Sequence, residues 1–77
     1  MRFRISISRK SGLADPEGVE TARALTDLGY SGITAVHFGR TITIEADDGS
    51  TAATVTEMCE RLLANPVIED FTVEVLE

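Results

Sequence analysis

Hydrophobic and polar residues alternate along several short stretches of this 77-residue chain. The alternation is typical of strands that bury one face, and it is clearest over residues 2–8, 41–46 and 71–75. Gly32 opens a further extended run, in which Val36 and Phe38 share one face and Ala35 and His37 the other, and we predict a strand over residues 32–38. Gly39 and Arg40 would then form the turn of a hairpin between residues 32–38 and the strand that follows.

Two other stretches show helical periodicity. The first covers residues 16–28: Asp15 is a typical N-cap, Pro16 suits the first helical position, and Gly29 suits the residue after the helix. The second helix begins after Ser50 or Thr51 and ends before Pro66, because the residue before a proline disfavours helical geometry. The apolar face of the second helix is predicted to consist of Val55, Met58, Cys59, Leu62 and Leu63.

The order strand, helix, strand, strand, helix, strand predicts one α+β domain over residues 1–77. We expect a βαββαβ ferredoxin-like fold, with a four-stranded antiparallel sheet and both helices on one of its faces. The other face would be polar, with Arg2, Arg4, Thr41, Thr43, Thr72 and Glu74. Exposed strand edges invite pairing with another chain, so we expect the protein to form homo-oligomers through a sheet face or sheet edges.

Composition and charge narrow the functional classes. Hydrophobic residues make up 43% of the chain, which is enough for a core, and a single cysteine excludes a disulfide scaffold. The formal net charge is −6, and most of it lies in residues 41–77. Such an acidic chain is a poor match for nucleic acid or anionic membranes. Without an apolar block like that of a signal peptide or membrane span, the expected location is cytoplasmic.

The chain offers few groups for chemistry. Cys59 lies on an apolar helix face, as expected of a core thiol, and His37 is the only histidine. Glu69 and Asp70 are neighbours on a predicted strand, so their carboxylates point to opposite faces. We therefore expect no catalytic residues and no metal or cofactor site in this chain.

Residues 9–12, Arg-Lys-Ser-Gly, precede a helix N-terminus, where an anion is favoured. Asp15 and Glu17 already place negative charge at that end of the helix. Anion binding at residues 9–12 is therefore only a weak candidate.

Four segments resemble the PurS family, the small subunit of bacterial and archaeal phosphoribosylformylglycinamidine synthase. Residues 58–71, MCERLLANPVIEDF, resemble the signature stretch of the family. The other three segments are Asp15–Gly18, Ala24–Tyr30 and Val36–Arg40. The sequence departs from the family pattern at Glu17, His37 and Arg40, where Gln, Arg and Lys are common.

The resemblance implies a non-catalytic subunit of a glutamine-dependent, ATP-dependent C–N ligase in de novo purine biosynthesis. Such a subunit forms homodimers or tetramers and bridges a synthetase (PurL-type) and a glutaminase (PurQ-type) subunit, which supplies ammonia from glutamine. ATP and Mg²⁺ would be used by the synthetase, with no cofactor in this chain.

We expect docking to involve two segments, one around Gly39–Arg40 and one over residues 65–70. Arg40 is predicted to lie exposed at a hairpin tip without an internal partner. The candidate docking residues are His37, Gly39, Arg40, Asn65, Pro66, Glu69 and Asp70.

Two alternatives stay open at this point. One is a free-standing ferredoxin-like regulatory protein that binds a small ligand at a dimer interface. The other is a small anion-handling enzyme that uses Arg9 and Lys10.

Overall fold

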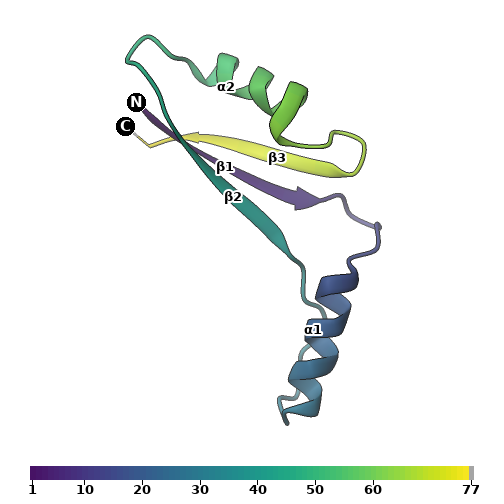
Figure 1. The fold of residues 1–77 in the computed structure, drawn as a ribbon. Coiled ribbons are helices and arrows are strands. Elements are labelled where there is room, and N and C mark those ends of the chain that lie inside the picture. The colour runs from purple at the N-terminus through teal and green to yellow at the C-terminus, as the bar shows by residue number, and fades with distance from the viewer. Residues whose placement is uncertain (77) are drawn as a thin grey trace.

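The computed structural model describes residues 1–76. In this part of the chain, three strands form one antiparallel sheet in the order β2-β1-β3, with two α-helices outside it (Figure 1). The elements in chain order are β1 (Arg2–Arg9), α1 (Pro16–Asp27), β2 (Gly39–Glu45), α2 (Ala52–Met58), the π-helical turn η1 (Cys59–Leu63) and β3 (Glu69–Val75).

The predicted four-stranded sheet is wrong. Residues 31–38 form no strand in the described chain; instead they return alongside α1 (Figure 1). Gly39 and Arg40 are the first residues of β2, where they pair with Ser8 and Ile7, rather than a hairpin turn. Alternation of polar and apolar residues indicates extended backbone, but it does not decide whether a neighbouring strand is available.

The prediction that both helices cover one sheet face is wrong for α1. Helix α1 and the returning segment, residues 16–38, project away from the sheet as an arm (Figure 1). The molecule measures 50 × 26 × 14 Å, and its radius of gyration is 16.0 Å. A compact chain of this length has a radius of gyration of about 11–12 Å. The arm therefore leaves this chain far more extended than a closed domain.

Local signals at the helix ends are confirmed. The Asp15 side chain accepts a hydrogen bond from the N–H of Gly18, and Pro16 opens α1. Gly29 follows the helix with φ +100°, and the N–H of Tyr30 donates to the carbonyl of Leu25, as in a Schellman C-cap. Thr51, one of the two predicted caps, accepts from the N–H of Thr54 in the first turn of α2.

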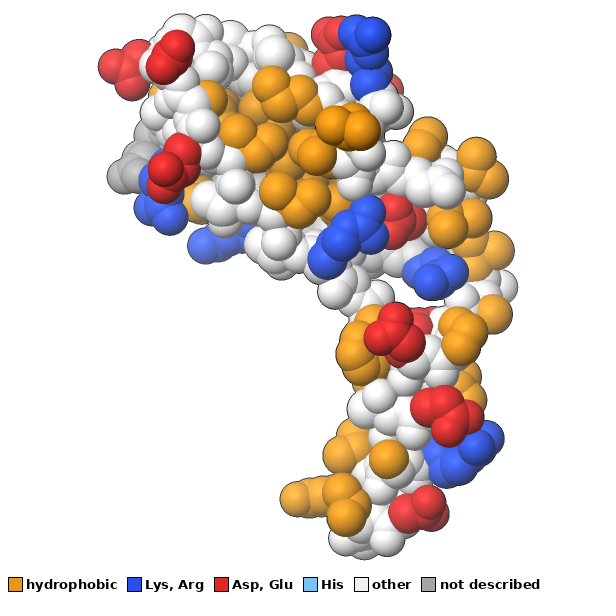
Figure 2. All heavy atoms as spheres, viewed as in Figure 1, with side chains coloured by type: hydrophobic (Ala, Val, Ile, Leu, Met, Phe, Trp, Pro, Cys, Tyr) orange, Lys and Arg blue, Asp and Glu red, His pale blue; other side chains and the backbone are white. Residues whose placement is uncertain are grey.

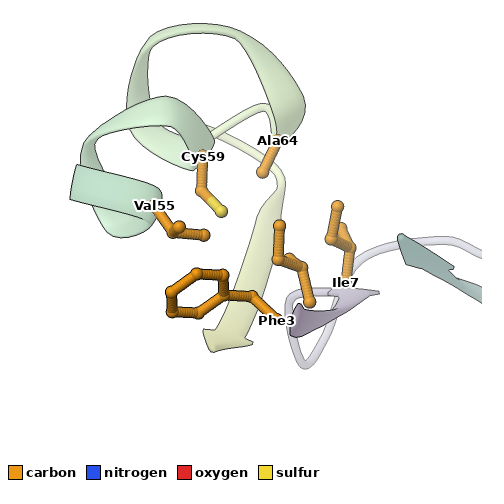
Figure 3. Packing of buried hydrophobic residues seen from close by; sticks show 6 residues of the cluster. Phe3, Ile7, Val55, Cys59 and Ala64 are labelled. Carbon is orange, nitrogen blue, oxygen red and sulfur yellow. The ribbon is translucent and has the colours of Figure 1, made fainter. Parts of the chain in front are cut away.

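The core lies between the sheet and α2. Strand β1 contributes Phe3, Ile5 and Ile7, which are at most 2% exposed, and these meet Val55 and Cys59 from the helical side (Figure 3). The burial of alternate residues confirms the prediction that β1 buries one face. Ile42 and Ile44 of β2 pack against this core but stay only half-buried, so the β2 side of the apolar sheet face is partly open.

The apolar face predicted for the second helix is only partly correct. Val55 and Cys59 are buried, whereas Met58 is 39% and Leu62 82% exposed. Over η1 the N–H of Ala64 donates to the carbonyl five residues earlier, at Cys59. This wider turn advances each residue less around the helix axis, so Leu62 turns away from the sheet and Ala64 is buried instead.

Candidate docking site

Arg40 and Glu69 form the centre of the predicted docking region. The Arg40 guanidinium donates to both carboxylate oxygens of Glu69, over 2.5 and 3.1 Å, and to the carbonyl of Leu63 over 2.9 Å. Arg40 is thus fixed by its own chain, and the prediction that it lacks an internal partner is wrong. The pair joins the start of β2 to the start of β3, 29 residues apart in sequence, which a local pattern does not show.

Asn65 organises the loop beside this ion pair. Its side chain accepts from the N–H of Val67, and its carbonyl accepts from the N–H groups of Ile68 and Glu69. Its own N–H donates to Glu69 over 2.8 Å. The loop before β3 is therefore held by a closed set of hydrogen bonds, with Pro66 exposed at its outer side.

These contacts shift the ionisation of both charged groups. The hydrogen bond from Arg40, followed by that from the Asn65 N–H, holds the pKa of Glu69 below its ordinary value. The same Glu69 carboxylate raises the pKa of Arg40. Glu69 is 15% exposed in its side chain and Arg40 is 50% exposed, so the cluster presents a fixed cation at the surface.

The remaining candidates are separated from this cluster. Asp70 pairs with Ser8 of β1. Its side chain lies on the polar sheet face, the face opposite to that of Glu69, as the alternation predicted. His37 is exposed at the base of the arm, two residues before β2 begins. Gly39 lies so close to β1 that an added Cβ would be 2.6 Å from the Ile7 carbonyl oxygen. The structure thus brings Gly39, Arg40, Asn65 and Glu69 together and leaves His37 and Asp70 on other surfaces.

A second arrangement, which the sequence did not reveal, holds the arm to the sheet. One carboxylate oxygen of Asp15 caps α1 through the N–H of Gly18, and the other accepts from the N–H of Phe38 over 2.8 Å. These backbone N–H groups, Phe38 first, hold the pKa of Asp15 below its ordinary value. We call this region, residues 9–15 with 37 and 38, the joint.

Sequence reasoning also missed the role of Gly18. It is buried within α1, and an added Cβ would lie 1.9 Å from the carbonyl oxygen of Val36. The returning segment can approach the helix this closely only because position 18 has no side chain. A glycine in the first turns of an otherwise good helix was the available signal.

Candidate chemistry elsewhere is limited in the described residues. Burial, followed by the nearby Glu60, raises the pKa of the Cys59 thiol, which is opposite to what a reactive thiolate needs. Among residues 1–76, no three His, Cys, Asp or Glu side chains lie together as metal ligands would. None of the helices described here has the length and apolarity to cross a membrane.

A three-stranded sheet, a protruding arm and a fixed polar cluster define the class as a small α+β assembly module. The comparisons with known proteins agree. Residues 2–77 match the PurS family model, described as phosphoribosylformylglycinamidine (FGAM) synthase. The chain is 38% identical to the PurS subunit of that synthase from Bacillus subtilis, over 99% of this chain and 93% of the relative.

Solved structures show the same relationship. The B. subtilis PurS structure has a TM-score of 0.86 at 37% identity, and Methanocaldococcus jannaschii PurS has 0.84 at 36%; each comparison covers 99% of this chain and 98% of the other. A chain in the structure of PurLQS from Thermotoga maritima has a TM-score of 0.78 at 30% identity, covering 95% of this chain and 93% of that one.

The chain belongs to the PurS family, as its sequence segments had indicated. Proteins of this family are subunits of FGAM synthase in purine biosynthesis.

Proposed function

We propose that this chain is a non-catalytic subunit that bridges the synthetase and glutaminase subunits of FGAM synthase. In this role it keeps ammonia released from glutamine available to the synthetase, which holds the ATP and Mg²⁺. The proposal places the assembly in the cytoplasm. The observation that carries it is the likeness, over nearly the whole chain, to a chain in the PurLQS structure of T. maritima.

The proposal includes a homodimer formed through the arm. The chain exposes 5595 Å², whereas a compact chain of 8.3 kDa exposes roughly 4,600 Å². The excess is about the area that one partner buries in a standard interface, roughly 800 Å². Because the arm projects away from the sheet, the chain leaves enough surface exposed for one stable protein–protein interface.

A second copy is the occupant that fits this surface. On the arm, Val19 and Leu28 are 58% and 75% exposed. On the sheet side, Met58 and Leu62 are exposed and Ile44 is half-buried. Figure 2 shows hydrophobic side chains gathered on the part formed by the sheet and α2, and others along the arm. Each copy thus offers apolar side chains on α1 and an apolar surface on the sheet side. The α1 helix of the same copy does not reach that surface, but α1 of a second copy can cover it.

We propose that some of the candidate docking residues contact a partner subunit and that others support the contacting surface. Arg40, Asn65 and Pro66 are exposed around the ion-paired cluster and suit contact with a larger subunit. Glu69 supports that surface through its ion pair with Arg40, and Gly39 lets β2 lie close to β1. His37 and Asp70 are exposed on other faces, so they would contact a partner only if it reached the arm or the polar sheet face.

Assembly of purified components tests the proposal. The chain is mixed with the synthetase subunit, with the glutaminase subunit and with both, and each mixture is separated by size with light-scattering detection. We expect all three proteins in one species, with less glutaminase bound when this chain is left out. Unchanged association of the other two subunits without this chain would contradict a bridging role.

A further inference from the structure

Arg9 and Lys10 differ from every other basic residue of the chain. Five of the seven Lys and Arg side chains lie within 4.0 Å of a carboxylate oxygen. The paired residues are Arg2, Arg4, Arg23, Arg40 and Arg61. Arg9 and Lys10 have no such partner within residues 1–76, although the protein carries an excess of carboxylates. The two unpaired cations are also adjacent in sequence, at the end of β1.

Both residues line one pocket at the joint. Its volume is about 300 Å³, and its lining includes Ser8, Ser11 and His37 besides the two cations. Lys10 is half-buried, and among the described residues no carboxylate oxygen lies within 4.0 Å of its ammonium. A bound anion would supply the charge partner that both cations lack.

Two of the three carboxylates near this pocket, those of Asp15 and Glu69, accept hydrogen bonds from other groups, and Glu17 lines the neighbouring pocket. Asp15 lies in the lining, and its two oxygens accept from the N–H groups of Gly18 and Phe38. Glu69 shares a neighbouring pocket with Arg9, but Arg40 and the Asn65 N–H take its oxygens. The charge of Arg9 contributes to lowering the pKa of both carboxylates, but neither carboxylate lies within the 4.0 Å of an ion pair from Arg9 or Lys10.

We propose that Arg9 and Lys10 bind a phosphate group in the pocket between the sheet and the arm. A phosphate monoester carries close to two negative charges and three acceptor oxygens at neutral pH, which matches two cations and the hydroxyl donors of Ser8 and Ser11. A carboxylate, with one charge, would leave one cation unmatched. The site is independent of the bridging role and is tested on the chain alone.

Titration of the isotopically labelled full chain with inorganic phosphate, followed by NMR, tests the site. We expect saturable shifts at the amides of Lys10, Ser11 and Gly12 that sodium chloride of equal ionic strength does not reproduce. Arg9→Gln and Lys10→Gln should each weaken binding about tenfold, the usual effect of losing one charge-assisted contact. Arg23→Gln, which removes a paired arginine from the arm, is the matched control and should leave the affinity unchanged.

Titrations with ribose 5-phosphate and with acetate show which kind of anion the site prefers. Ribose 5-phosphate binding more tightly than inorganic phosphate would assign the site to a phosphate ester, and equal affinity would assign it to the phosphate group alone; both support the proposal. Shifts that follow ionic strength only, binding unchanged in both glutamine variants, or acetate binding as tightly as phosphate would each overturn it. The same spectra report whether the variants are folded.

Discussion

The carboxylate of Asp15 accepts a hydrogen bond from the backbone N–H of Phe38, 23 residues further along the chain. The same side chain caps α1 through Gly18, so one residue fixes both the start of the arm and the point where the chain re-enters the sheet. Its capping role follows from the local sequence, whereas the bond to Phe38 depends on the arm folding back on itself.

Stability should depend on pH through Asp15 and Glu69. Both pKa values are lower in the folded chain than their ordinary values of 3.8 and 4.5, so the unfolded chain binds more protons at low pH. Their stabilisation is therefore complete above about pH 5.5 and is lost as the pH falls through the folded pKa values. Urea unfolding at several pH values measures this dependence.

The control for this dependence is the double variant Asp15→Asn, Glu69→Gln. Its free energy of unfolding should be lower than that of the parent at neutral pH and should fall less on acidification. Parallel curves for the parent and the double variant would show that other carboxylates cause the acid sensitivity.

Gly18→Ala should destabilise the arm, although alanine normally favours a helix over glycine by about 1 kcal/mol. The added Cβ would lie 1.9 Å from the Val36 carbonyl oxygen, so the returning segment has to move. We expect a loss of about 1–3 kcal/mol, as for overpacking, measured by chemical denaturation. Gly49→Ala, where no atom lies within 4 Å, should be close to neutral; an equal loss at both positions would refute this explanation.

The Arg40–Glu69 pair can be tested by charge reversal. Arg40→Glu places two carboxylates together, and Glu69→Arg places two guanidinium groups together, so each should lower the melting temperature. The double reversal should recover part of this loss. It should not recover all of it, because the bond from the Asn65 N–H to Glu69 is lost. A double variant no more stable than either single variant would show that the pair contributes nothing.

The same three variants separate folding from docking. If a partner contacts the positive charge of Arg40, the double reversal should bind the synthetase subunit weakly even where its stability is recovered. Full recovery of both stability and affinity would mean that Arg40 acts only within its own chain.

The arm predicts the oligomeric state. The chain should sediment as a dimer, and Leu28→Glu should shift it toward a monomer with an unchanged far-UV circular dichroism spectrum, because it places a charge on an apolar contact. Val67→Glu is a matched control, since Val67 is 77% exposed but lies outside the arm. Loss of the dimer in both variants, or in neither, would contradict a contact through the arm.

Local features of the fold could be predicted from sequence, and long-range ones could not. Asp15, Pro16 and Gly29 specify the ends of α1 through contacts within a few residues, and both ends are confirmed. Residues 32–38 were predicted as a strand because alternation does not reveal that α1, rather than a strand, lies beside them. The family resemblance identified the family, because it rests on residues, but it did not correct the predicted four-stranded sheet.

The candidate site shows the same limit. Arg40 was predicted to lack an internal partner because its partner, Glu69, is 29 residues away in the sequence. Leu62 was assigned to the core because an α-helix was assumed throughout, whereas the π-helical turn exposes it. A change of helix type of this kind has no simple local signal in the sequence.

Glutamine-dependent turnover by the reconstituted synthase tests the bridging role most directly. Activity is measured with glutamine and with free ammonia as nitrogen donor, each with and without this chain. The bridging role predicts that glutamine-dependent turnover requires the chain, while turnover with ammonia persists without it. Equal glutamine-dependent turnover in both cases would contradict the bridging role.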